Sequence, residues 1–121
     1  MFTETLEQDD AVLGLVCEGK LSQDDLKRMH ALLHDRIAST PKPGLVVDLG
    51  NFAGYEDLSA ALEDLKMDAA HRNDFSRVAV VGSREWMELG TELVKFLTSA
   101  DMRWFDIGGA DEALEWVREG R

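Results

Sequence analysis

Apolar positions near the start of the chain follow the two patterns that β-strands show. Residues 2–6 alternate between apolar and polar side chains, whereas residues 11–17 are almost continuously apolar. Alternation is typical of a strand with one solvated face, and a short continuous run is typical of a buried strand. Because a polar, acidic stretch at positions 7–10 separates the two runs, we predict an opening antiparallel β-hairpin.

Apolar residues at helical spacing recur four times after residue 20. The first stretch begins after Ser22, a good N-cap residue that precedes an acidic first turn, and it ends before Pro41. Three further apolar stripes occupy residues 58–69, 86–97 and 110–117. The pattern therefore predicts four helices.

Continuous apolar runs lie between the predicted helices. They cover residues 45–49, 77–81 and 102–105, and the stretch from 50 to 55 is expected to form a loop. Strands that alternate with helices are connected by right-handed crossovers and form a mainly parallel sheet. We therefore predict one α/β domain over residues 1–121, with a mixed, mostly parallel five-stranded sheet in the order ββαβαβαβα.

The charge of the chain limits the partners that it attracts. With 24 acidic against 13 basic residues, the net charge is −11, which repels phosphate backbones and anionic lipids. Nucleic acid is therefore excluded as a partner, and the lack of a long apolar run argues against stable membrane insertion. The start of the chain lacks the features of a signal peptide, and the lone Cys17 lies in an apolar run, so we expect a cytoplasmic protein without a disulfide.

Histidine spacing gives one candidate metal site. His30 and His34 stand four residues apart on the first predicted helix, which is the spacing that zinc proteases use. Ala31 occupies the position where those proteases need a glutamate, and the chain offers one further histidine, His71, and no second cysteine. We therefore expect helix-surface histidines and no metal site.

Catalytic motifs are missing from the sequence. It contains no G-x-S-x-G elbow and no glycine-rich phosphate loop of the known patterns. The candidate serines have structural explanations, because Ser83 stands at a predicted N-cap and Ser59 in the first turn of a helix. We expect no catalytic residue, no cofactor and no enzymatic activity.

Polar and aromatic residues gather where the predicted parallel strands end. Open parallel sheets bind ligands beyond these carboxyl ends, near a switch in strand order. Such a mixture of side chains suits a small apolar or amphipathic molecule with a polar tip. In the alternative, Asp48 caps loop amides and Trp86 fills the core. The candidate ligand-binding residues are Asp48, Phe52, Tyr55, Ser83, Arg84 and Trp86.

Four segments of the chain have a distinctive sequence. The most specific is His71-Arg72-Asn73-Asp74-Phe75-Ser76-Arg77-Val78-Ala79-Val80-Val81-Gly82-Ser83-Arg84-Glu85-Trp86, and the others are Gly19-Lys20-Leu21-Ser22, Val46-Val47-Asp48-Leu49 and Asp111-Glu112-Ala113-Leu114-Glu115-Trp116. In these segments the chain resembles the SpoIIAA-like family, which neighbours the STAS and CRAL-TRIO-like domains. This resemblance implies a β/α superhelical sheet, a small stand-alone bacterial protein and no established enzymatic activity.

The resemblance implies two modes of action. CRAL-TRIO relatives hold lipids, which matches a small apolar ligand as the first hypothesis. STAS relatives act as anti-sigma-antagonist-like interaction modules, which gives a protein partner, docked near residues 50–60, as the alternative. Those relatives carry a phosphorylatable serine in an Asp-Ser-Ser-Gly turn, whereas this chain has Glu56-Asp57-Leu58-Ser59-Ala60, so we expect no phosphorylation of Ser59.

Self-association is a further expectation. The third predicted helix carries apolar side chains, Met87, Val94 and Phe96 among them, that exceed what one small sheet can cover. We therefore expect a homodimer.

Overall fold

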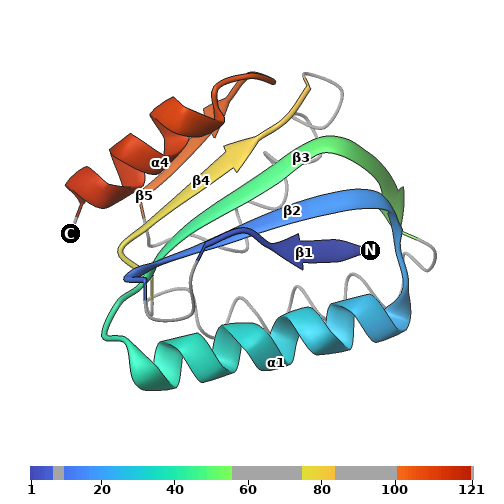
Figure 1. Ribbon diagram of the computed structural model, residues 1–121, viewed down its shortest axis with the longest axis horizontal. Helices are drawn as coiled ribbons and strands as arrows, with labels where there is room; N and C mark the ends of the chain where they lie inside the picture. The colour runs from blue at the N-terminus through green and yellow to red at the C-terminus, as the bar shows by residue number, and fades with distance from the viewer. Residues whose placement is uncertain (7–9, 56–74, 84–100, 121) are drawn as a thin grey trace.

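The computed structural model describes residues 1–6, 10–55, 75–83 and 101–120, and Figure 1 shows the arrangement of their helices and strands. The predicted helices at 58–69 and 86–97 lie outside the described residues, whereas the opening hairpin and the first and last helices are confirmed. The elements in chain order are β1 (Phe2–Glu4), β2 (Val12–Leu21), α1 (Gln23–Ser39), β3 (Gly44–Tyr55), β4 (Arg77–Val81), β5 (Asp101–Phe105) and α4 (Ala110–Glu119).

The five strands form one sheet in the order β1-β2-β3-β4-β5. β1 pairs antiparallel with β2, and the remaining neighbours are parallel, so the predicted mixed sheet is confirmed. Spatial order follows sequence order throughout these strands. The described strands therefore contain no switch in strand order of the kind beside which open parallel sheets bind ligands.

Strand β3 is longer than the sequence pattern predicts, since residues 50–55 continue the strand and do not form a loop. The partner strand β2 also continues, to Leu21, and supplies the hydrogen-bonding ladder. The pairing of β2 with β3 shifts register twice in this stretch, and each shift adds one residue to β3. Val16 pairs with Asp48 but Glu18 with Asn51, and the second shift follows Gly19. These are β-bulges, which bend and twist a strand without ending it.

Alternating residues of the sheet build a core on each face. On one face, Val46 and Ala79 pack with Ala113 and Val117 of α4. On the other face, Leu13, Leu15 and Leu45 pack with Met29, Leu32 and Leu33 of α1. Figure 1 shows the two helices on opposite sides of the sheet. Neighbouring positions such as 45 and 46 thus serve different cores, which explains why β2 and β3 have continuous apolar runs.

Helix α1 begins at a complete capping box. The Ser22 hydroxyl accepts a hydrogen bond from the Asp25 N–H, and the Asp25 carboxylate accepts one from the Ser22 N–H, at 3.1 and 3.0 Å. The same carboxylate binds the α-ammonium group of Met1 at 3.0 Å and pairs with Arg28. The Ser22 N–H and then the ammonium group hold the pKa of Asp25 well below its usual range. One carboxylate therefore joins β1 to the start of α1.

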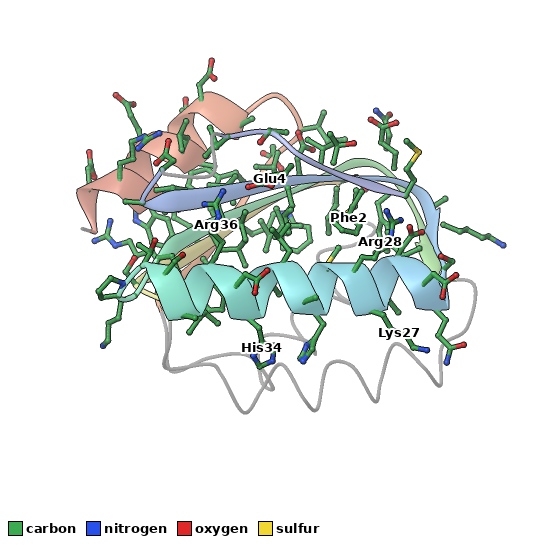
Figure 2. All side chains as sticks on the ribbon, turned by 60° about the horizontal axis from the view of Figure 1, so that its bottom comes forward. Phe2, Glu4, Lys27, Arg28, His34 and Arg36 are labelled. Atoms are coloured by element: carbon green, nitrogen blue, oxygen red, sulfur yellow. The ribbon has the colours of Figure 1, made fainter. Side chains whose placement is uncertain are left out.

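Two arginines tie the elements together at the opposite end of α1. Arg36 is buried, pairs with Glu4 of β1 and donates to the carbonyl oxygen of Asp10. Figure 2 shows Arg36 and Glu4 facing each other between α1 and β1. Arg118 of α4 forms a two-pronged ion pair with the Asp10 carboxylate, at 3.0 and 2.8 Å. The segment before β2 is thereby connected to helices on both faces of the sheet.

We expect Asp25→Asn to lower the free energy of unfolding by about 1–2 kcal/mol, because it weakens the capping box and removes the ion pair with Met1. The pKa of Asp25 is lowered by folding, so its contribution is complete above about pH 5 and is lost as the pH falls below about 4. Denaturant melts at pH 7 and pH 3 measure both effects. The exposed neighbour Asp24→Asn is the matched control, and equal losses in the two variants would contradict the role of Asp25.

Cys17 should resist thiol reagents in the folded protein. It is 1% exposed, and burial raises the pKa of its thiol to about 11. At pH 8 such a thiol carries at least about 100-fold less thiolate than an ordinary cysteine, and thiolate is the reacting species. We expect iodoacetamide labelling, followed by mass spectrometry, to be suppressed by that factor until urea unfolds the chain. Comparable labelling rates in native and unfolded protein would refute this.

Candidate interaction surface on β2 and β3

Two of the predicted ligand-binding residues, Asp48 and Phe52, lie on opposite faces of the sheet. Asp48 follows Val46 by two positions, which places it on the face that α4 covers further along the strand. Phe52 packs with Cys17, Leu21 and Leu26 on the α1 face. A single small molecule lying on one face of the sheet therefore could not contact both side chains.

Asp48 has a structural role at the first bulge. Its Oδ1 atom accepts a hydrogen bond from the Gly50 N–H at 2.8 Å, across the point where the register shifts. A bulge leaves an extra residue without a ladder partner, and the carboxylate supplies an acceptor there. Asp48 thus caps one local amide, and that amide belongs to a strand and not to a loop.

Phe52 is a core residue. It is 7% exposed and packs against the first turn of α1, where Leu26 is also buried. Its position beyond the predicted strand end suggested a pocket lining, but the strand continues and turns the ring inward. The structure places the backbone of Tyr55 opposite Leu21. Ser83 is half-buried just after β4, and Arg84 and Trp86 lie outside the described residues.

Trp104 is a residue of this sheet edge that the sequence analysis missed. Its indole Nε1–H donates to the carbonyl oxygen of Gly82 at 3.2 Å, across the end of β4. A Cβ atom on Gly82 would lie 3.2 Å from the Trp104 ring and 3.3 Å from Leu49. A glycine directly after an apolar strand was the available signal, since it lets a large side chain of the next strand cover the backbone.

The extended ends of β2 and β3 present an exposed face on the side opposite α1. Cys17 and Leu21 point toward α1, so Glu18 and Lys20 lie on the other face, as do the residues that flank Phe52. We call this surface the ribbon face. Its exposed members are Glu18, Lys20, Asn51 and Ala53.

The ribbon face combines both charges with a small apolar centre. Glu18 pairs in register with Asn51, and Lys20 with Gly54 at the second bulge. Gly54 has φ 112°, a conformation that other residues rarely adopt. The hydrophobic cluster of Phe52, Cys17, Leu21 and Leu26 lies beneath it and holds the two strands to α1. The surface is therefore exposed but built on a packed layer.

Comparison with known proteins places the chain in a family. The family model described as SpoIIAA-like matches residues 12–118, which is most of the chain. The protein therefore belongs to the SpoIIAA-like family. The comparison with curated proteins found no match.

Solved structures similar to this fold include the following two. One is an uncharacterized protein with a SpoIIAA-like fold from Shewanella loihica PV-4, with 30% identity, a TM-score of 0.74, and coverage of 97% of this chain and 92% of that chain. The other is the anti-sigma factor antagonist SpoIIAA in its unphosphorylated form, with 10% identity, a TM-score of 0.65 and coverage of 98% of both chains. At 10% identity the likeness concerns the fold alone.

Among the described residues, no helix is both long and apolar enough to cross a membrane. These residues also contain no group of three or more histidine, cysteine, aspartate or glutamate side chains placed to share a metal ion. Ser59 and the apolar helix residues behind the expected homodimer lie outside the described ranges, so both of those expectations stay predictions.

We expect Trp104→Phe to lower the free energy of unfolding by about 1 kcal/mol, because it removes the hydrogen bond to Gly82 while keeping most of the ring. Denaturant melts measure this loss. Phe105→Leu, a change of the neighbouring core residue, is expected to cost a similar amount through lost packing and shows that the assay detects changes in β5. An unchanged stability of Trp104→Phe would show that the indole hydrogen bond contributes nothing.

Proposed function

We propose that this protein is a non-enzymatic protein-interaction module whose partner docks on the ribbon face. The observation that carries the proposal is the exposed, bulged extension of β2 and β3 with Asn51 and Ala53 at its surface. Membership of the SpoIIAA-like family and the shared fold with an anti-sigma factor antagonist support an interaction role.

The divergence of the predicted ligand residues favours a protein partner over a small apolar ligand. Asp48 is engaged with Gly50 on one face, and Phe52 is buried on the other. A protein partner needs no pocket, because it recognises a surface through a packed centre with a polar rim. Ala53 would supply such a centre, with Glu18 and Lys20 at the rim.

The state of the single cysteine, Cys17, supports the proposal that the protein is not an enzyme. Cys17 is buried, and its raised pKa keeps it protonated at neutral pH, which is the opposite of an activated nucleophile. Asp48, the carboxylate among the predicted ligand-binding residues, already accepts a backbone hydrogen bond. Neither group is arranged for general acid–base or nucleophilic chemistry.

The test compares two matched substitutions, Ala53→Arg on the ribbon face and Ala110→Arg at the exposed start of α4. Each tagged variant is used to capture proteins from an extract of the source organism, and quantitative mass spectrometry measures what is retained. We expect a stoichiometric partner with the unmodified protein and Ala110→Arg, and at least about tenfold less with Ala53→Arg, a difference of about 1.4 kcal/mol. Circular dichroism checks that both variants fold.

Two outcomes would contradict the proposal. Equal capture by the two arginine variants would move the docking surface elsewhere. Native mass spectrometry that finds a retained small molecule in the freshly purified protein, with no protein partner, would instead favour the ligand-binding hypothesis.

A further inference from the structure

The imidazole rings of His30 and His34 are in direct contact with each other. Their Nε2 atoms are 2.8 Å apart, and their ring centres are 4.3 Å apart with 66° between the ring planes. From the sequence we expected helix-surface histidines and no metal site at these positions. Figure 2 shows His34 on the side of α1 opposite to the one that faces β1, together with Lys27.

The Nε2 atoms of the two rings lie at hydrogen-bonding distance, and either ring can be the donor. Two imidazoles that bind one ion in adjacent planar positions, at about 2.0 Å each, have nitrogens about 2.8 Å apart and ring centres about 4.4 Å apart. The observed nitrogen and ring-centre distances match these values, so one ion fits both nitrogens in place of the hydrogen bond with little change in their spacing.

We propose that His30 and His34 form a two-histidine binding site for a divalent transition-metal ion of square-planar preference, Cu²⁺ or Ni²⁺. Imidazole nitrogen is a preferred ligand for both ions, whose planar coordination sets adjacent ligands at about 90°. Tetrahedral Zn²⁺ requires the nitrogens about 3.3 Å apart, so it would have to spread the pair.

Two properties of the chain support the site beyond the pair itself. Helix α1 is 17 residues long and is fixed at its start by the capping box and at its end by buried Arg36, so the two ligands stand on a rigid element. The net charge of −11 concentrates cations near the surface of the protein. The proposal concerns α1 alone and is independent of the ribbon face.

The test is calorimetric titration of untagged protein with Ni²⁺ and Cu²⁺, because a histidine tag would itself bind these ions. We expect the unmodified protein to bind one ion per chain. In His30→Ala and in His34→Ala we expect the affinity to fall by at least about tenfold, because removing a group that only orients a metal ligand already lowers affinity by that factor. Mg²⁺, which prefers oxygen ligands, should give no heat of binding.

A spacing variant separates the pair from the mere number of histidines. His34→Ala combined with Ala38→His keeps two histidines on α1 but sets them eight residues apart, on different turns of the helix. We expect this double variant to bind as weakly as His34→Ala alone. Affinity equal to that of the unmodified protein in either variant, or no binding by the unmodified protein, would overturn the proposal. Circular dichroism confirms that each variant retains α1.

Discussion

The parallel ladder between β2 and β3 runs from the Val12–Gly44 pair to the Leu21–Tyr55 pair, and it decides on which face each side chain lies. A shift of one residue in this register would exchange the two cores, because side chains alternate across a strand. The bulges therefore matter more than their size suggests. They insert residues in β3, and the first insertion places Phe52 on the α1 face, whereas strict alternation from Val46 would place it on the α4 face.

The same ladder explains what could be predicted from the sequence and what could not. Continuous apolar runs and the Ser22 cap gave the strands and the start of α1, because these signals are local. Whether residues 50–55 form a strand or a loop depends on strand β2. Gly50 and Gly54 suggest a loop unless β2 continues alongside them and pairs with this segment. The candidate site depended on that pairing: in a regular strand Asp48 and Phe52 would share one face, and the extra residue at the first bulge moves Phe52 to the opposite, α1 face.

For the charged residues too, the sequence predicts the net charge but not the ion pairs, which depend on contacts between distant segments. Composition alone predicted an acidic protein that repels nucleic acid, but it did not show that several basic side chains are used internally. Arg36 lies buried against Glu4, and Arg118 binds Asp10 from the other side of the sheet. The Arg118 guanidinium holds the pKa of Asp10 below its usual range. Breaking a buried pair by removing one partner leaves the other charge uncompensated, so Arg36 is less replaceable than an exposed basic residue.

Helix α1 has two sides with different consequences for the fold. Its inner side covers the sheet through Leu26 and Met29, and its ends are held by Asp25 and Arg36. Its outer side presents His30 and His34, whose spacing exists only while the segment is helical. An ion that needs both imidazoles binds the folded state in preference to the unfolded one, so its binding energy adds to the stability of α1. Because α1 also anchors β1 and covers Phe52 beneath the ribbon face, stabilisation of this helix would extend to both strands that carry that surface.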